Sequence, residues 1–220
     1  MHYISPQRPW LILLMSLALL WFIGQTADAQ NRSWYSVHRS FSEGVEIASS
    51  QFQANAGIVS RNDERTTRAK ILSIARSQIG VREKTGNNDG FDVEKYLATT
   101  GLGAGYAWCA AYVNWVYQQA GICKPTSLQA WSPSWFPPER TYWSVGENEY
   151  QPPMPGDVFG IFFSSKGRIA HVGIIEDWNG KYANTIEGNT NDAGSREGDG
   201  VYRKIRLKKQ ISKVSNWIKI

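Results

Sequence analysis

The order of hydrophobic patterns along the chain is the strongest constraint on its fold. Apolar residues recur at the spacing of a buried helical face in "TTRAKILSIARSQIG", "FDVEKYLATTG" and "CAAYVNWVYQQAG". Four later segments, 157–163, 170–178, 181–189 and 201–209, have the apolar runs and flanking turn residues typical of β-strands. Helices that precede a series of short strands predict an α+β fold, with the helices packed on an antiparallel sheet.

Each predicted helix has one stripe of residues that should be buried. The first helix begins at Thr66 and ends at Gly80, a residue suited to a helix C-terminus. In the third, Asn114 and Gln118 fall on the opposite side, and Gly121 ends the helix. The residues expected to be buried are Ile71, Leu72, Ala75 and Ile79 in the first helix, Val93, Tyr96 and Leu97 in the second, and Cys109, Val113, Val116 and Ala120 in the third.

The N-terminal 29 residues have the pattern of an export signal. An apolar run at 10–24 follows a short start that contains Arg8, and Ala27 and Ala29 form an A-x-A cleavage site before Gln30. The run is shorter than the roughly 20 residues of a membrane span. We therefore expect a signal peptide at 1–29, a polar lead-in at 30–63 and one domain at 64–220. The mature protein would be periplasmic or extracellular, or membrane-anchored if the signal is retained.

The net charge of +5 suits contact with an anionic polymer or surface. No zinc-finger, RRM or basic-helix pattern is present, so we expect no nucleic-acid binding. In the last predicted strand, Val201, Ile205 and Leu207 should face inward. Tyr202, Lys204, Arg206 and Lys208 should face outward, either toward an anionic cell-wall polymer or simply toward solvent.

Residues 85–94, "TGNNDGFDVE", superficially resemble a calcium-binding loop through Asn87, Asp89 and Asp92. The glutamate that an EF-hand needs at its twelfth position is missing. Asp92 is better placed to cap the helix that follows it. The sequence therefore predicts no metal site and no cofactor.

The two cysteines in the third helical segment and just after it bear on both fold and chemistry. An exported protein can form disulfides. If the segment from Cys109 to Cys123 is helical, however, about 20 Å separates the two residues, whereas a disulfide needs Cα atoms within about 7 Å. We favour the helix, which leaves Cys123 as a spare thiol.

Cys109 is the first residue of the predicted helix, where the helix dipole and free N–H groups favour an anion. A thiol there ionises more easily, and the thiolate is the attacking form of cysteine. Two interpretations remain open from this feature alone: Cys109 is a nucleophile, or it is a packed core residue.

His171 is the one histidine inside the predicted fold, at the start of a strand. We predict a three-residue loop, 178–180, between this strand and the next, with Gly180 in the left-handed region. That register places His171 directly across from Glu187 on one face of the sheet, with Asn189 diagonal to it. A two-residue Asn179–Gly180 turn would instead put Glu187 on the other face. The longer loop brings a cysteine, a histidine and a glutamate together as nucleophile, base and orienting group.

Four stretches, "GYAWCAAYVNWVYQQAG", "PGDVFGIFF", "IAHVGIIED" and "TIEGNTN", together resemble the CHAP domain family of cysteine- and histidine-dependent amidohydrolases and peptidases, within the papain-like, NlpC-type superfamily. The resemblance spans roughly residues 66–210. It implies a papain-like fold in which Cys109 is the nucleophile, His171 the general base, Glu187 the orienting residue and Asn189 an accessory polar residue.

The resemblance further implies an exported peptidoglycan amide hydrolase that uses no metal or cofactor. It leaves an endopeptidase and an amidase as alternatives. Two other functions are considered: a catalytically silent wall- or glycan-binding module, and an acyl-transfer enzyme on the same fold. We expect a monomer, and an inhibitor or immunity protein is a conceivable partner.

Aromatic residues near the predicted nucleophile are candidates for substrate binding. Tyr106 and Trp108 directly precede the helix, and Tyr106 is also a candidate second oxyanion donor. Trp131 and Trp135 lie in a Pro-rich loop with Phe136, Tyr142 and Trp143. These rings could form a platform for sugars or stem peptides, or they could simply pack the loop onto the domain.

Overall fold

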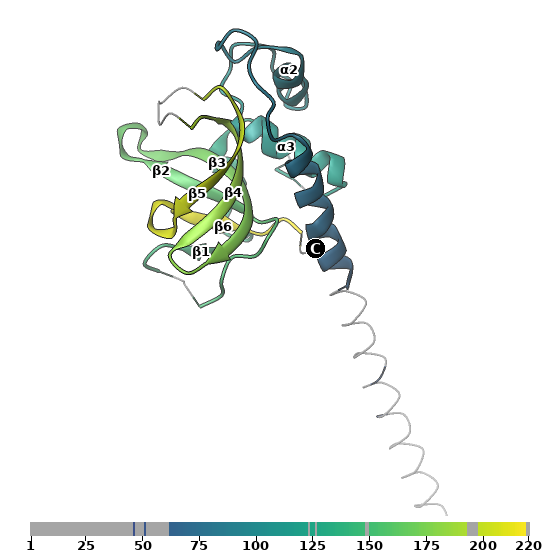
Figure 1. The fold of residues 1–220 in the computed structure, drawn as a ribbon. Coiled ribbons are helices and arrows are strands. Elements are labelled where there is room, and N and C mark those ends of the chain that lie inside the picture. Colours follow the sequence, from purple (N-terminus) through teal and green to yellow (C-terminus); the bar gives the residue numbers. More distant parts are fainter. Residues whose placement is uncertain are drawn as a thin grey trace, which may run out of the picture. The chain divides into compact units, whose positions relative to one another are not determined.

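The computed structural model describes residues 46, 51, 62–122, 124–125, 127–147, 150–192 and 198–218 (Figure 1). The expected signal peptide, nearly all of the lead-in and Cys123 lie outside the described residues. The chain divides into two units, 1–60 and 61–220, and the fold below is that of the second. Among the described residues, no helix is both long enough and apolar enough to cross a membrane.

Three helices come first in the folded unit. They cover residues 62–77, Phe91–Ala98 (α2) and Cys109–Ala120 (α3). The expected stripes are buried in all three, with one exception. Ile79 is exposed because the first helix ends at residue 77, so that Ile79 lies in the turn before Gly80.

Two polar residues on these helices differ from expectation. Asp92 does not cap α2. The cap position is Gly90, and Asp92 lies in the first turn, 2.7 Å from Lys95 Nζ. Asn114 is fully buried rather than exposed, because its amide donates to the backbone and hydroxyl oxygens of Thr99. α2 and α3 pack together there, and this hydrogen-bonded pair of polar side chains forms part of the contact.

Six antiparallel strands form one sheet in the order β1-β6-β2-β3-β4-β5. Their bounds are Thr141–Ser144, Val158–Phe163, Arg168–Asn179, Tyr182–Thr190, Gly200–Leu207 and Lys213–Ser215, for β1 to β6. The α+β class with an antiparallel sheet is confirmed. Four of the strands lie where the sequence predicts them. The short strands β1 and β6, which pair with each other, were not expected.

The helices and the sheet enclose the main core. α3 packs against β3 and β4, and Figure 1 shows the helices gathered on one side of the sheet. Val172, Ile174 and Ile186 face this core, whereas Phe159 and Ile175 belong to a second apolar cluster, with Ile211 and Val214 of the C-terminal segment. Both faces of the central strands are therefore buried.

The β3–β4 register corrects the expected three-residue loop. The turn consists of Gly180 and Lys181, because Asn179 pairs with Tyr182. A bulge at Glu176 then shifts the pairing, so that Ile174 lies opposite Ile186. Continued by one residue on each strand, this register places Gly173 opposite Glu187. Glu187 is thus diagonal to His171 rather than directly across from it, but it is on the same face, as expected.

The faces of β5 are the reverse of the expected ones beyond Val201. Ile205 is 70% exposed, while Arg206 turns toward the sheet and hydrogen-bonds Glu187. Lys204 bonds Asp192 and the backbone of Asn191. These two cations therefore have partners within the domain.

Candidate active site

Cys109 is the first residue of α3, and Trp108 occupies the cap position without a side-chain cap. The sulfur belongs to a free thiol, and the residue is only 7% exposed. Because the first N–H groups of a helix have no partner within it, the start of α3 offers both donors and a positive partial charge beside the sulfur.

His171 interacts with both Cys109 and Glu187. Nε2 of His171 lies 2.7 Å from Oε2 of Glu187. The imidazole also interacts with the Cys109 thiol, and each of these two groups shifts the pKa of the other. The structure therefore brings together the three residues that the sequence analysis selected.

Glu187 is fully buried and has three side-chain partners. Besides His171, Thr185 donates its hydroxyl to Oε1 at 2.6 Å, and Arg206 reaches both carboxylate oxygens, at 2.8 and 2.5 Å. Gly173 leaves room for this group, since a Cβ there would lie 2.9 Å from Cγ of Glu187. The carboxylate is thus fixed from three sides.

The pKa values of the three groups shift in the directions that an ion pair requires. Burial raises the pKa of Cys109, but the hydrogen bond and charge of His171 outweigh it, and the net pKa lies below the ordinary thiol value. Burial lowers the pKa of His171, whereas its contacts with Cys109 and Glu187 raise it to about 9. Burial opposes ionisation of Glu187, yet Arg206 and His171 hold its pKa well below the usual range. These shifts favour a thiolate beside an imidazolium.

Two further groups contact the sulfur that the sequence analysis missed. The hydroxyl of Ser132, at the start of the 3₁₀ helix Ser132–Trp135 (η1), lies 3.7 Å from Sγ, and the backbone N–H of Val172 also hydrogen-bonds it. Both lower the pKa of Cys109. A serine in a Pro-rich loop carries no sequence signal for this contact, because only the tertiary fold places η1 against β3.

The side chain of Asn189, the expected accessory polar residue, contacts Trp108. Its backbone is left-handed, with φ 52°. With its amide oxygen toward Trp108, the side chain accepts from the backbone N–H at 3.1 Å and from the indole N–H at 3.0 Å. The indole also donates to Glu83 at 2.8 Å. Asn189 thus anchors the residue that precedes Cys109.

Two of the four aromatic candidates for substrate binding are exposed to solvent, and the other two are buried. Tyr106 is 57% and Trp131 43% exposed, so both can meet a ligand. Trp108 and Trp135 are fully buried, and their assignment to substrate binding is wrong. Trp108 stacks on Tyr96, and Trp135 packs edge-on against Tyr117 and Trp217. Phe136 and Trp143 are buried too, so most of these rings pack the loop onto the domain.

The segment 85–94, which resembles a calcium-binding loop in sequence, is stabilised by hydrogen bonds between its own residues. Asp89 accepts from the backbone N–H and the hydroxyl of Thr85, both at 2.9 Å. Within the described ranges of the chain, no three His, Cys, Asp or Glu side chains are grouped as metal ligands.

Comparison with known protein families agrees with this geometry. Residues 101–189 match the family model of the CHAP domain. This part of the chain is similar to a CHAP domain. The matched segment runs from the loop before α3 to β4 and includes Cys109, His171 and Glu187, and CHAP domains are papain-like. CHAP domains form a hydrolase and amidase family. No curated protein matches it.

Proposed function

We propose that this protein hydrolyses amide bonds in the peptide part of peptidoglycan. Cys109 is the nucleophile, His171 transfers the proton and Glu187 orients the imidazole. The observation that carries the proposal is the grouping of the Cys109 thiol, at the start of α3, with His171 and Glu187. It supplies a nucleophile, a proton carrier and an orienting carboxylate side by side.

The reaction follows from these residue types. The Cys109 thiolate attacks the amide carbonyl, and the backbone N–H of Cys109 donates to the developing oxyanion. The His171 imidazolium protonates the leaving amine, the C–N bond breaks, and an acyl thioester remains on Cys109. His171, now neutral, takes a proton from water as that water attacks the thioester. The acid product leaves, and the thiolate–imidazolium pair is restored.

The supporting residues preserve this arrangement without touching the reacting atoms. Thr185 and Arg206 fix the Glu187 carboxylate, and Asn189 holds Trp108 at the start of α3. Asn189, the expected accessory polar residue, is therefore a positioning residue in our proposal.

The CHAP match and the expected export signal support the proposed substrate and compartment. Peptidoglycan is the proposed partner, reached in the periplasm or outside the cell after signal cleavage at residues 1–29. Both an endopeptidase and an amidase use the same three residues, so the bond that is cut is decided by the substrate-binding surface.

Digestion of purified peptidoglycan tests the proposal. The full chain is compared with Cys109→Ala, and mass spectrometry identifies the fragments and the new amine and carboxyl ends. We expect cleavage by the wild-type chain and none by Cys109→Ala, with the same thermal unfolding midpoint for both. Equal cleavage by the two chains would refute the nucleophile, and no cleavage by either would leave the binding module as the better function. Fragments joined to an added amine acceptor would instead indicate acyl transfer.

A further inference from the structure

An exposed cation–aromatic pair lies beside the candidate active site. The guanidinium of Arg168 is 3.9 Å from the ring centroid of Trp131. The indole is 43% exposed, so the pair forms part of the accessible surface. Stacking on an aromatic face holds an arginine in place without using its hydrogen-bond donors.

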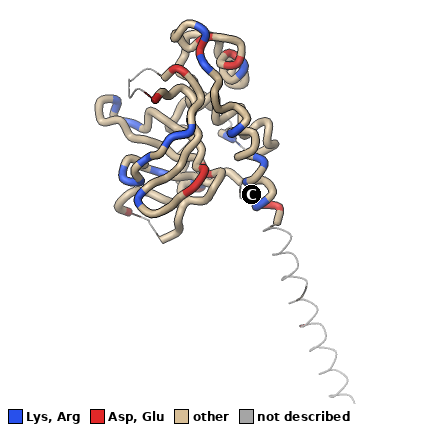
Figure 2. The backbone as a smooth tube through the Cα atoms, viewed as in Figure 1, with Lys and Arg blue, Asp and Glu red and all other residues tan. Residues whose placement is uncertain are grey.

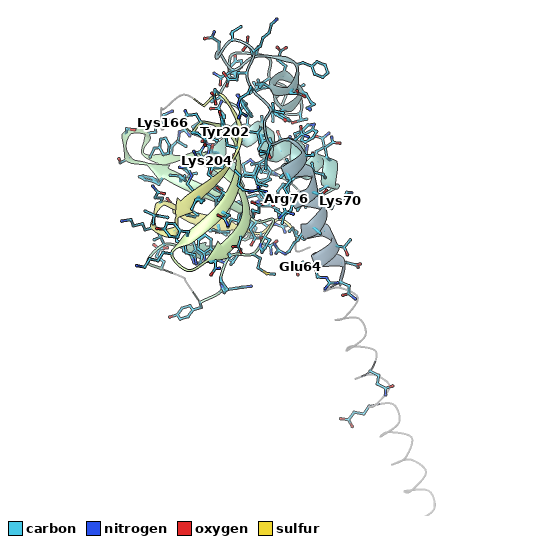
Figure 3. All side chains as sticks on the ribbon, viewed as in Figure 1. Glu64, Lys70, Arg76, Lys166, Tyr202 and Lys204 are labelled. Atoms are coloured by element: carbon cyan, nitrogen blue, oxygen red, sulfur yellow. The ribbon has the colours of Figure 1, made fainter. Side chains whose placement is uncertain are left out.

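Both members of the pair are close in sequence to residues of the candidate active site. Trp131 directly precedes Ser132, whose hydroxyl lies 3.7 Å from the Cys109 sulfur. Arg168 begins β3, three residues before His171, and a bulge at Ala170 lies between them. Figure 3 shows Lys166 at the tip of the β2–β3 hairpin, two residues before Arg168. Two separate elements, η1 and β3, thus carry the Arg168–Trp131 pair to the same edge of the catalytic centre.

The three segments that supply Cys109, Ser132 and His171 contain no acidic residue. These segments are residues 102–122, 127–138 and 158–175. Their only Lys or Arg residues are Lys166 and Arg168. In Figure 2 the β2–β3 hairpin accordingly has blue segments and no red ones. This wall of the site therefore favours an anionic group on the substrate.

The donors of Arg168 are available to such a group. Nη1 donates to the backbone carbonyl of Ile169 at 3.0 Å. Within the described residues, the structure gives no hydrogen bond to Nε or Nη2 and no ion pair to this guanidinium. The edge formed by Nε and Nη2 matches the two oxygens of a carboxylate.

We propose that Arg168, held against Trp131, binds a free carboxylate of the substrate next to the scissile amide. The inference rests on the proposed hydrolase function and deepens it, because it names the substrate class: peptides whose residue beside the cleaved bond keeps an unblocked carboxylate. The same peptide with that carboxylate converted to a primary amide keeps its shape but loses the charge and one acceptor.

Paired substrates test this subsite. Purified peptidoglycan is digested in its native form and after carbodiimide coupling of ammonia to its free carboxylates, and synthetic peptides spanning the bond then give kcat/KM for acid and amide. We expect the wild-type chain to prefer the acid by about tenfold or more, as for a charge-assisted hydrogen bond. In Arg168→Gln this ratio should fall below about threefold, while cleavage of the amide peptide stays within about threefold of wild type.

Two variants separate the subsite from general charge effects and from folding. Lys166→Gln removes the same charge two residues away and should leave the acid-to-amide ratio within twofold of wild type. Arg168→Lys keeps the charge without the two-point edge and should give an intermediate ratio. A wild-type ratio near one, or an unchanged ratio in Arg168→Gln, overturns this inference while the hydrolase stands. Absence of cleavage of either substrate by the wild type overturns both.

Discussion

His171 and Glu187 are not opposite each other in the β3–β4 ladder, yet Nε2 of the histidine lies 2.7 Å from Oε2 of the glutamate. Gly173 occupies the position across from Glu187 in the continued register, so the carboxylate side chain crosses a strand position that has no Cβ. The hydrogen bond between His171 and Glu187 therefore depends on Gly173, because a larger residue there would occupy the space of the Glu187 side chain.

Gly173→Ala should disturb the site from within the sheet. A Cβ at this position would lie 2.7 Å from the Phe159 ring and 2.9 Å from Glu187 Cγ, so one of the two must move. We expect the free energy of unfolding to fall by about 1–3 kcal/mol, as in overpacked cores, with a loss of hydrolysis. Urea unfolding and peptidoglycan digestion measure the two effects. Gly103→Ala is the control, because nothing lies within 4 Å of a Cβ there. Equal stability of the two variants would contradict the crowding.

Glu187→Gln should lower the pKa of His171. The negative charge and hydrogen bond of Glu187 help to raise that pKa to about 9, so their loss reduces the imidazolium population at neutral pH. Hydrolysis should fall by about 100-fold or more, as when proton transfer is impaired. NMR titration of histidine-labelled protein measures the pKa, with His171→Ala identifying the signal among three histidines. An unchanged titration would show that the carboxylate does not act on the ring.

Arg206→Gln should destabilise the fold, because it removes two hydrogen bonds to a fully buried carboxylate. We expect a loss of about 2 kcal/mol at pH 7. The pKa of Glu187 is lowered in the fold, so the stability from its ion pairs is present above the pKa of an unfolded glutamate and is lost as the pH falls below it. The difference between wild type and variant should therefore shrink in acid, as measured by denaturation between pH 3 and 7.

Arg203→Gln is the matched control for Arg206→Gln on the same strand. Arg203 is half-exposed and pairs with Glu176, so its loss should cost less than about 1 kcal/mol. If the two arginine variants were equally stable, the buried carboxylate would not need Arg206.

The sequence was sufficient to predict that Cys109, His171 and Glu187 lie together, because each has a recognisable local sequence context. Cys109 starts an amphipathic segment, His171 lies in a strand, and Glu187 lies in the following strand at an even offset. Next to the actual turn, the residue numbers of paired positions have an odd sum, as for Asn179 and Tyr182. The bulge at Glu176 makes this sum even, as for Ile174 and Ile186, which is the parity that the predicted loop also gives. The correct face was therefore predicted from an incorrect loop, since a bulge has no clear sequence signal.

Other parts of the site depend on tertiary contacts that local patterns do not encode. Alternation in β5 predicted that Arg206 would face solvent, but the buried Glu187 carboxylate requires a cation on the inner face, and Ile205 is exposed instead. Trp108 and Trp135 were candidates for substrate binding because Trp108 directly precedes Cys109 and Trp135 lies in the aromatic, Pro-rich loop, although packing of that loop was the alternative. Their burial follows from packing between α2, α3 and the C-terminal segment.

The most direct test of the central claim is the pH dependence of iodoacetamide alkylation at Cys109. Cys123→Ser is introduced in every chain so that only one thiol reacts. The lowered pKa of Cys109 and the raised pKa of His171 predict that the alkylation rate rises at a lower pH than for an ordinary thiol, and His171→Ala should move this rise toward the ordinary thiol pKa of about 8.5. A rate that rises only above about pH 8.5 in both chains, or a thiol that does not react while the protein is folded, would contradict a nucleophile activated by His171.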